Sequence, residues 1–344
     1  MRILHVANFS INKYGSVFYA TDRKISSGLI KNNHFVYDFS YRDICRNESI
    51  FRSTKFGTGK VNKRLLQSCD NVGPDLLLLG HSELITAETL AEIKTRFPST
   101  KIALWYVDAL WNKKKTAHLY ERLSQIDIIF ATTSGDYLKE FVTQTNSAAF
   151  IPNIVDETIE SKQAFTQDNH DHDLIFCGRD SQEPERQEFL ENVYKEAGKH
   201  VRCTFRGCFG QPLITGYQYL EFLGSSKMGL NISRRNDVPL CSSGRLAQLV
   251  GNGLLTFCPN VPGMRTLFND AELVYFDSLD ELIEKIIYYH AHDKERNEVA
   301  HNGWLRAHSS FNSKRVTQYM IERIFDLPLS EQYEWEEEFF SHAT

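Results

Sequence analysis

Short apolar runs alternate with segments of helical periodicity along the whole chain. The apolar runs predict strands buried on both faces, at 3–7, 76–79, 101–107, 126–131 and 148–151 in the first half and at 174–177, 201–205, 229–232, 254–257 and 273–276 in the second. The segments between them predict helices at 21–31, 86–96, 117–125, 136–143, 184–197, 215–225, 245–250, 279–290, 293–306 and 312–325. This alternation indicates parallel sheets covered by helices on both sides.

The alternation stops once, in a polar stretch at 157–173, which we interpret as an interdomain linker. We therefore expect one domain at residues 1–156, a second at 174–312 and a C-terminal segment at 313–344. The predicted fold class is α/β, with two Rossmann-like doubly wound domains facing a central cleft. In such sheets ligands bind beyond the carboxyl ends of the strands, so residues at those ends are candidates for chemistry.

Length and composition agree with this division. At roughly 100–200 residues per domain, 344 residues suffice for two domains. The net charge of -5 argues against nucleic-acid binding, which needs a basic surface. Seven scattered cysteines without a Cys-x-x-Cys pair favour reduced thiols over disulfides or a zinc site. No signal peptide or membrane-spanning run is visible, so we expect a cytoplasmic location.

Polar residues follow two of the strands expected in the first half. His81 and Glu83 come just after the run 76–79, and Asp108 comes just after the run 101–107. A side chain at such a strand end can act as a general base. Three structural roles are the alternatives: Asp108 could cap the next helix, His81 could bond to the backbone, and Glu83 could start a helix. We expect Asp108 and His81 to be catalytic, with Asp108 as the base if the reaction inverts configuration.

The loop after the first strand is polar and flexible enough to approach a sugar or a phosphate. It contains Asn8 and Gly15, which we place with Glu83 on the acceptor side. The loop has no G-x-G-x-x-G fingerprint, so an enzyme that uses a nicotinamide cofactor is disfavoured.

Gly178 and Arg179 follow the first strand of the second half. Glycine permits the backbone to approach a ligand closely, and the planar guanidinium of arginine suits phosphate oxygens. A surface salt bridge is the alternative role for Arg179.

A longer segment of the second half combines several polar features. The strand 229–232 leads into Ser233 and Arg234, and a loop then carries Ser243, Gly244 and Arg245 into a helix. Free N–H groups and the positive end of the helix dipole make such a start an anion site. Gln248 follows one turn later and could reach a ribose or sugar hydroxyl. An ordinary capped helix with a surface arginine is the alternative.

Residues from about Gly229 to Ile324 resemble the C-terminal half of GT-B-type glycosyltransferases, which have two Rossmann-like domains. The resemblance is to the spore-maturation-protein-like group within glycosyl transferases group 1. The shared features occur here in the family's order: an Asn-x-Ser turn ending at Ser233, an Arg-x-x-Glu-like helix starting at Arg245, the segment Leu267–Phe276, Asp280-Glu-Leu-Ile, and Ala300-x-x-Gly303 with His308.

The resemblance implies transfer of a sugar from a nucleotide-sugar donor to an acceptor hydroxyl, in bacterial surface polysaccharide or glycoconjugate assembly. It implies that the donor binds to 174–312 and that residues 313–344 pack back on the first domain. The proposed donor contacts are Gly178, Arg179, Ser233, Arg234, Ser243, Gly244, Arg245 and Gln248. Gln248 stands where the family has an acidic residue, so it can bind hydroxyls but carries no charge.

No metal and no cofactor are expected besides the nucleotide-sugar substrate, because arginines can stabilise the departing phosphate. The expected acceptor is a saccharide or a lipid-linked saccharide. Lys113-Lys114-Lys115 could make peripheral contact with the inner membrane surface, and a solvated helix start is the alternative. Two other functions stay open: a sugar-nucleotide epimerase or hydrolase on the same fold, and a non-catalytic homologue that binds a nucleotide-sugar.

Overall fold

The structure is a computed structural model that describes residues 1–179 and 184–342. The chain divides into two compact units. Unit 1 comprises Met1–Pro152 and Ser313–Thr344, and unit 2 comprises Asn153–Asn312. The polypeptide therefore leaves unit 1 after Pro152 and returns to it at Ser313.

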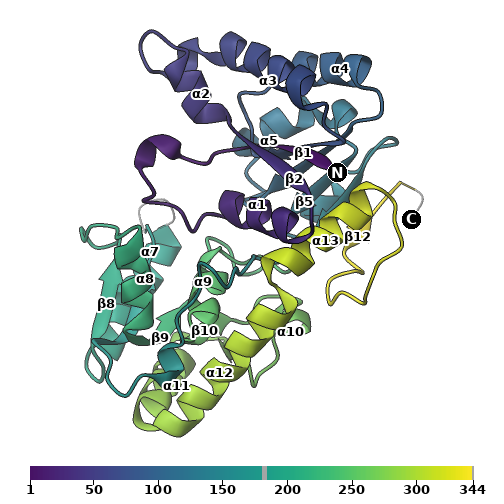
Figure 1. The fold of residues 1–344 in the computed structure, drawn as a ribbon. Coiled ribbons are helices and arrows are strands. Elements are labelled where there is room, and N and C mark those ends of the chain that lie inside the picture. The colour runs from purple at the N-terminus through teal and green to yellow at the C-terminus, as the bar shows by residue number, and fades with distance from the viewer. Residues whose placement is uncertain (180–183, 343–344) are drawn as a thin grey trace. The chain divides into compact units, whose positions relative to one another are not determined.

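The described residues of unit 1 form a seven-stranded sheet in the order β12-β6-β5-β4-β3-β1-β2 (Figure 1). Its strands are β1 (Arg2–Ala7), β2 (Phe35–Ser40), β3 (Leu76–Gly80), β4 (Lys101–Tyr106), β5 (Ile128–Ala131), β6 (Ser147–Phe150) and β12 (Phe339–Phe340). All neighbours pair in parallel except β12, which is antiparallel to β6. Every residue of β3 is buried, as expected for a central strand with helices on both faces.

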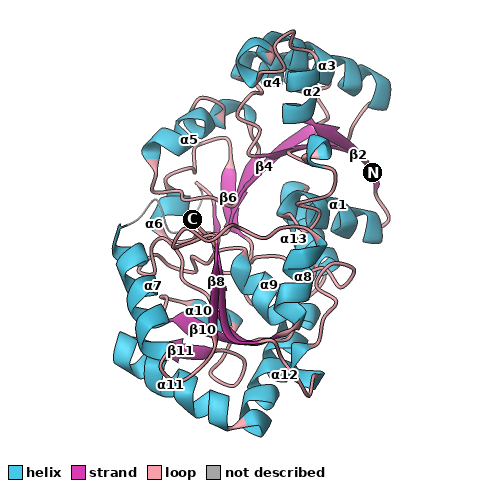
Figure 2. Ribbon diagram, turned by 90° about the vertical axis from the view of Figure 1, so that its left-hand side faces the viewer, coloured by secondary structure: helices cyan, strands magenta, loops and turns pink. Residues whose placement is uncertain are grey.

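The helices of unit 1 lie on both sides of its sheet. They are α1 (Thr21–Lys31), α2 (Tyr41–Asn47), α3 (Thr58–Val72), α4 (Ala87–Arg96), α5 (Lys113–Tyr120), α6 (Asp136–Lys139) and α13 (Ser313–Ile324), with short 3-10 turns η1 (Ile11–Lys13), η2 (Thr54–Phe56) and η3 (Leu123–Gln125). In Figure 2, α5 lies on one side of the strands of unit 1, and α1 and α13 lie on the other.

Helix α13 packs tightly against α1. A side chain at Gly28 would place its Cβ 2.1 Å from the carbonyl oxygen of Ser313, so the close approach requires glycine. Asn32, which follows α1, donates to the carbonyl of Lys314 (2.7 Å) and to the hydroxyl of Thr317 (3.0 Å). The C-terminal residues thus belong to the core of unit 1, together with β12.

The described residues of unit 2 form a five-stranded parallel sheet in the order β11-β10-β9-β7-β8. Its strands are β7 (His172–Cys177), β8 (Cys203–Arg206), β9 (Ser226–Leu230), β10 (Leu255–Pro259) and β11 (Val274–Phe276). Its helices are α7 (Pro184–Ala197), α8 (Tyr217–Gly224), α9 (Arg245–Gly251), α10 (Met264–Leu267), α11 (Leu279–Ala291) and α12 (Asp293–Ser310), with η4 (Ala164–Thr166). Helices α7 and α11 lie on one side of this sheet, and α8, α9 and α12 lie on the other (Figure 2).

The polar stretch 157–173 is not a free linker, which corrects the prediction. It packs within unit 2, where Glu160 is fully buried and accepts a hydrogen bond from the backbone N–H of Asp156 (2.9 Å). Ala164 donates its N–H to the carbonyl of Asn252 (3.0 Å), and His172 already belongs to β7. The polar composition of this stretch suggested a linker. Local hydrogen bonds and backbone contacts satisfy its polar groups, so the stretch can pack despite its composition.

Among the strands and α-helices that the structure describes in unit 1, the sequence did not predict β2, β12, α2 and α3. Strand β2 is an edge strand, with Phe35 and Tyr37 exposed, so it lacks the continuous apolar run of the central strands. Its place at the edge explains why the hydrophobic pattern did not reveal it.

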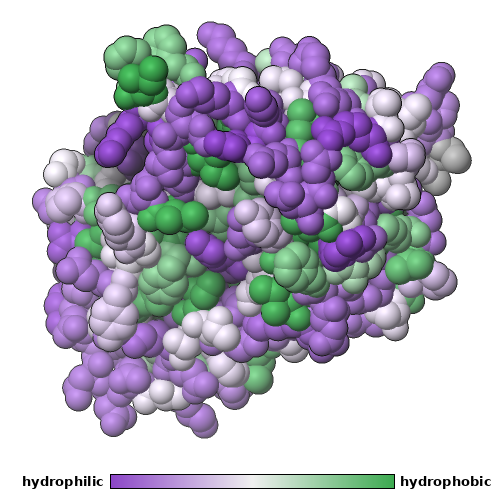
Figure 3. All heavy atoms as spheres, turned by 45° about the horizontal axis from the view of Figure 1, so that its top comes forward, coloured by the Kyte–Doolittle hydropathy of each residue, from purple (hydrophilic) through white to green (hydrophobic). Residues whose placement is uncertain are grey.

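Polar residues cover most of the face shown in Figure 3, with some apolar patches between them. A group of apolar side chains projects at one corner of that face, over the connection between α2 and α3. In the described part of the chain, no helix is both long and apolar enough to cross a membrane.

Candidate functional site

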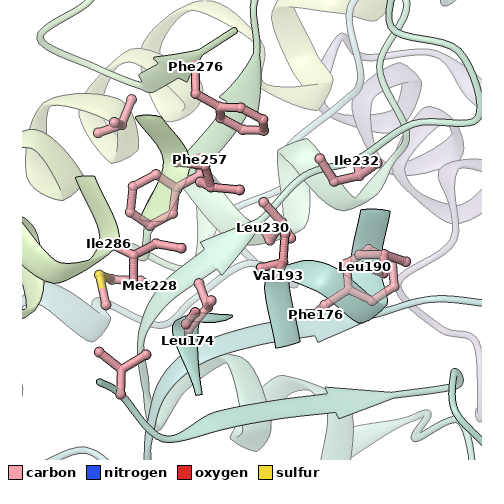
Figure 4. Close-up of a cluster of buried hydrophobic side chains, with 14 of the residues drawn as sticks. Leu174, Phe176, Leu190, Val193, Met228, Leu230, Ile232, Phe257, Phe276 and Ile286 are labelled. Atoms are coloured by element: carbon pink, nitrogen blue, oxygen red, sulfur yellow. The ribbon is translucent and has the colours of Figure 1, made fainter. Parts of the chain in front are cut away.

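A pocket of about 990 Å³ lies at the carboxyl ends of β9, β10 and β11 in unit 2. It reaches the first turn of α7, and its floor joins the hydrophobic core, since Ile232 and Phe276 belong to both (Figure 4). Its lining consists of Pro184, Glu185, Arg186, Phe189, Ile232, Ser233, Arg234, Arg235, Asn236, Asp237, Pro259, Asn260, Pro262, Phe276 and Asp277. This edge of a parallel α/β sheet is where such folds bind ligands.

Ser233 and Arg234, both predicted as donor contacts, line this pocket. Ser233 is only 6% exposed, and its hydroxyl has no hydrogen-bond partner among the described residues. Buried hydroxyls are normally bonded, so a buried one without a partner beside a pocket marks a place where a ligand atom can bind. The neighbouring Arg235 forms an ion pair with Asp237.

Arg245 lies directly beside the pocket. Its Nε donates to the carbonyl of Cys177 at the end of β7 (3.2 Å), and its NH1 donates to the carbonyl of Ile232 just past β9 (3.2 Å). The guanidinium carbon lies 4.3 Å from the centroid of the Phe176 ring. No carboxylate of the described residues pairs with it, and burial lowers its pKa to about 10, helped by the nearby Arg186. A buried cation without an anionic partner is suited to bind a phosphate.

Gly178 makes room for this arginine. A Cβ at Gly178 would lie 3.2 Å from NH2 of Arg245 and 3.1 Å from the Phe176 ring. Arg179 follows as an exposed residue and is not part of the pocket lining that the described residues form. The structure therefore gives Gly178 a packing role and leaves Arg179 at the end of β7.

The loop before α9 is held by side-chain hydrogen bonds. Asn153 donates to the hydroxyl (2.7 Å) and the carbonyl (3.2 Å) of Ser242, and the Ser243 hydroxyl donates to Asn231 (3.3 Å). The backbone N–H of Arg245 donates to the Ser243 hydroxyl (3.2 Å), while Gly244 is exposed. These bonds fix the start of α9 and thereby the position of Arg245.

Gln248 lies one turn into α9. Its side-chain oxygen Oε1 accepts a hydrogen bond from the hydroxyl of Tyr219 on α8 (2.8 Å). This contact orients the side-chain amide, which leaves its NH2 group as the donor for a ligand. The geometry suits recognition of a hydroxyl.

Several residues that line the pocket were not predicted from the sequence. Arg186 lies over the Phe176 ring (5.4 Å), on which Arg245 also lies, so two cations share one aromatic ring. The rings of Phe189 and Phe276 stack with an interplanar angle of 8° and centroids 6.1 Å apart. A helix-starting arginine and a pair of aromatics carry no local signal, since only the fold brings them together.

In unit 1, Asp108 follows β4 and is partly exposed. One carboxylate oxygen accepts from the N–H of Ala109 (3.0 Å), and the other lies 3.4 Å from Nζ of Lys115. Asp108 is not the cap of α5, because Asn112 caps that helix by accepting from the N–H of Lys115. The capping alternative is thus excluded.

His81 packs on the ring of Tyr106, with centroids 4.4 Å apart. Its Nε2 accepts a hydrogen bond from the N–H of Val107 (3.4 Å), which is the backbone-bonded alternative. Burial lowers its pKa to about 4, against the opposing charge of Asp108. The imidazole is therefore neutral at pH 7, with its acceptor nitrogen engaged.

Glu83 is held in a charged cluster rather than at the start of a helix. It forms an ion pair with Arg42 (2.6 Å) and accepts a hydrogen bond from the hydroxyl of Tyr41. Burial acts to raise its pKa, but the bond from Tyr41 and the charge of Arg42 outweigh burial and hold the pKa below its usual value. Glu83 is thus an anion that is paired with Arg42.

His81 and Ser82 both have left-handed backbones, with φ of 53° and 45°. Such conformations cost free energy in residues other than glycine and cluster at functional sites. The buried Arg122 binds the carbonyls of Ser82 (2.8 Å) and His81 (3.0 Å) and the hydroxyl of Ser82 (3.0 Å). Arg122 was not predicted, and it holds this turn in place.

The first loop of unit 1 is organised by two carboxylates. Asn8 donates its N–H to Asp22 (2.8 Å), and Ile11 donates its N–H to Asp43 (2.7 Å). Gly15 has a φ of 86° with open space around its Cα. Asn8 and Gly15 thus belong to one structured loop after β1.

Residues 184–322 match a protein family described as glycosyl transferase-like. This match confirms the resemblance and covers α7, α9 and the residues that line the pocket. No curated protein matches the sequence.

Solved structures of similar fold include a sucrose-phosphate synthase from Thermosynechococcus elongatus, at 12% identity and a TM-score of 0.59 over 95% of this chain and 99% of that one. HepE of Anabaena, solved with UDP, is 12% identical with a TM-score of 0.54 over 95% and 100% of the two chains. A UDP-GlcNAc 2-epimerase from Neisseria meningitidis, bound to UDP-GlcNAc, is 12% identical with a TM-score of 0.51 over 95% and 100%. These likenesses confirm the predicted GT-B-type fold, with a parallel α/β sheet in each unit.

Proposed function

We propose that this protein is a glycosyltransferase that moves a sugar from a nucleotide-sugar donor to an acceptor hydroxyl, and that the donor binds to unit 2. One observation carries the proposal: the pocket at the carboxyl edge of unit 2 lies beside Arg245, a buried cation that no described carboxylate neutralises. A bound diphosphate would supply the missing negative charge.

The roles of the donor residues follow from their contacts. Arg245 and Arg186, which share the ring of Phe176, would stabilise the charge that develops on the departing phosphate. The hydroxyl of Ser233, which has no partner among the described residues, would bind an oxygen of the donor, and the amide of Gln248 would bind a hydroxyl. Because arginines supply the positive charge, we expect transfer to persist after chelation of divalent metals.

The glycosyl transferase-like family match supports this reaction class. The structures of HepE with UDP and of the epimerase with UDP-GlcNAc show that proteins of this fold bind uridine nucleotides. We propose a nucleotide-sugar as donor here, and a saccharide or lipid-linked saccharide of a bacterial surface polysaccharide as acceptor.

Asp108 is the residue of unit 1 that we propose as the base for the acceptor hydroxyl. Its carboxylate is partly exposed at the end of β4, and Lys115 lies 3.4 Å from it. His81 is neutral with its acceptor nitrogen engaged, so it suits positioning or hydrogen bonding better than proton removal.

The test is a transfer assay with a panel of nucleotide-sugars and acceptors, with product analysis by mass spectrometry. We expect a glycosylated acceptor from the wild type and a loss of about 100-fold or more in Asp108→Asn, in line with removal of a general base. The exposed Asp136→Asn in the same unit is the control and should keep full activity.

The epimerase alternative rests on the similar fold of the UDP-GlcNAc 2-epimerase from Neisseria meningitidis. Incubation with donor alone separates the two functions, because an epimerase converts the sugar without an acceptor. Conversion of the donor in the absence of acceptor, without transfer when acceptor is added, would overturn the proposal.

A further inference from the structure

The connection between α2 and α3 in unit 1 exposes three large apolar side chains. Ile50 is 89% exposed, Phe51 74% and Phe56 68%, and the rings of Phe51 and Phe56 lie 5.6 Å apart. They belong to the connection over which Figure 3 shows an apolar corner. We call residues 49–57 the apolar tip. Contiguous exposed apolar side chains of this kind mark interaction surfaces.

The backbone of the apolar tip is anchored, so the exposure of its side chains is a product of the fold. Ser49 is buried, its hydroxyl accepts from the N–H of Ser53 (3.4 Å), and its carbonyl accepts from the N–H of Arg52 (3.0 Å). The thiol of Cys45 donates to the carbonyl of Thr54 (3.4 Å). The bonds of Ser49 hold the turn within the tip, and the bond of Cys45 ties Thr54 to α2.

The tip lies within a strongly basic part of an acidic protein. Residues 46–64 contain one acidic residue, Glu48, and six basic ones, Arg46, Arg52, Lys55, Lys60, Lys63 and Arg64, whereas the whole chain has a net charge of -5. The single carboxylate is already engaged, since Glu48 pairs with Arg64 (2.7 Å). Arg52, Lys55, Lys60 and Lys63 are exposed. A matching partner would have an anionic surface for the basic side chains and an apolar layer beneath that surface for Ile50, Phe51 and Phe56.

We propose that the apolar tip docks unit 1 on a lipid bilayer that contains anionic lipids. Aromatic and aliphatic side chains would enter the headgroup boundary, and the surrounding lysines and arginines would contact lipid phosphates. A second copy of this chain does not fit as partner, because a symmetric contact would bring two basic surfaces together. The charge of the tip thus selects the bilayer.

This surface differs from Lys113–Lys115, which the sequence suggested for membrane contact. Lys113 forms an ion pair with Glu140, and Lys115 lies 3.4 Å from Asp108, so two of those three charges already have anionic partners. That lysine run also lacks exposed large apolar side chains comparable to Ile50 and Phe51. Docking by the apolar tip would suit a lipid-linked acceptor, but it does not depend on the proposed reaction.

The test is co-flotation of the purified full chain with vesicles, without any nucleotide. We expect binding to vesicles of phosphatidylcholine with phosphatidylglycerol and little binding to phosphatidylcholine alone. Phe51→Ser with Phe56→Ser should weaken binding by about tenfold or more, because the apolar side chains drive insertion. Arg52→Gln with Lys55→Gln should weaken binding to anionic vesicles and make it less sensitive to salt.

The matched control is Phe35→Ser, which removes a phenylalanine that is 57% exposed on the edge strand of the same unit. It should bind vesicles like the wild type, and circular dichroism would verify that all variants fold.

Equal binding of the folded tip variant and the wild type would overturn the proposal. So would loss of binding in Lys113→Gln with Lys114→Gln alone, or tip-dependent dimerisation in place of vesicle binding. Nucleotide binding by these variants, measured separately, would show whether the donor site is intact.

Discussion

Arg245 shows how one residue can combine a structural and a chemical role. Its guanidinium joins the ends of β7 and β9 through two backbone carbonyls and rests on Phe176, so the fold determines where the cation lies. Two hydrogen bonds leave several of its five N–H groups for a ligand. The cation is therefore fixed in place before a phosphate binds, which avoids a reorganisation cost on binding.

Ser233 gives a sharp test at the same site. Its buried hydroxyl has no partner in the described part of the chain, so Ser233→Ala should leave the stability unchanged or raise it by about 1 kcal/mol. The nucleotide affinity should fall about five- to tenfold. Urea unfolding and nucleotide titration measure the two effects.

Ser226→Ala is the matched control, because the buried Ser226 hydroxyl donates to the carbonyl of Phe222. That change should lower the stability by about 1 kcal/mol and leave the nucleotide affinity unchanged. If Ser233→Ala destabilised the protein without affecting affinity, Ser233 would be a structural residue only.

His5 predicts a pH dependence of stability. It is fully buried, accepts from Trp105 Nε1 (3.0 Å) and contacts the Ser26 hydroxyl (2.8 Å), and burial, aided by the charge of Arg23, lowers its pKa to about 3. Below pH 6.5, His5 becomes protonated in the unfolded chain but stays neutral in the folded protein. Stability should therefore fall as the pH drops from 6.5 toward 3, by up to about 1.4 kcal/mol per pH unit from this group.

Asp22 acts in the opposite direction, because burial raises its pKa to about 6 and the folded state takes up a proton more readily than the unfolded state between pH 6 and 3.8. Urea unfolding at several pH values checks the balance. His5→Asn should reduce the dependence between pH 6.5 and 5, and an unchanged slope in that variant would exclude His5 as its source.

At the scale of elements, the contact between α1 and α13 depends on a glycine. Gly28→Ala should destabilise the protein by about 1–3 kcal/mol, because the new Cβ would meet the carbonyl of Ser313 at 2.1 Å. Gly59→Ala in α3, where nothing lies within 4 Å, should be neutral or stabilising by up to about 1 kcal/mol. Thermal or urea unfolding would show the opposite signs, and equal effects would contradict the packing of α13.

The turn after β3 gives a second prediction at this scale. Arg122→Met removes the donors that hold the left-handed His81 and Ser82, so this turn should relax and the KM for acceptor should rise, with nucleotide binding unchanged. The exposed Arg96→Met is the control and should keep the wild-type KM. An unchanged KM in a folded Arg122→Met would remove this turn from the acceptor side.

The sequence predicted the central strands and most helices because their apolar runs and helical periods are strong and local. It did not reveal β2, whose outer face is exposed, nor the packing of 157–173, whose polar groups are satisfied by local hydrogen bonds and by backbone contacts such as that with Asn252. The sequence could point to Ser233 and Arg234, which line the pocket, and to Arg245, because these residues follow a strand end or start a helix. Arg186, Phe189 and Arg122 could not be found, because only the folded chain brings them beside other functional groups.

At the scale of the whole molecule, each unit has its own sheet, and we assign a different part of the proposed reaction to each unit. Unit 2 contains the pocket and the cations, and the family match at 184–322 falls almost wholly within it. Unit 1 contains Asp108, Glu83 and the apolar tip. The likeness to solved GT-B structures extends over about the whole chain, so both units take part in the similarity.

The central claim is that Arg245 helps unit 2 bind the diphosphate of a donor, and calorimetric titration with a panel of nucleoside diphosphates tests it most directly. The account predicts that at least one nucleotide binds the wild type and that Arg245→Met binds it about 10- to 100-fold more weakly, as expected for a hydrogen bond to a charged group. The exposed Lys195→Met, on α7 of the same unit, should bind like the wild type. Equal affinity of a folded Arg245→Met and the wild type would contradict the account.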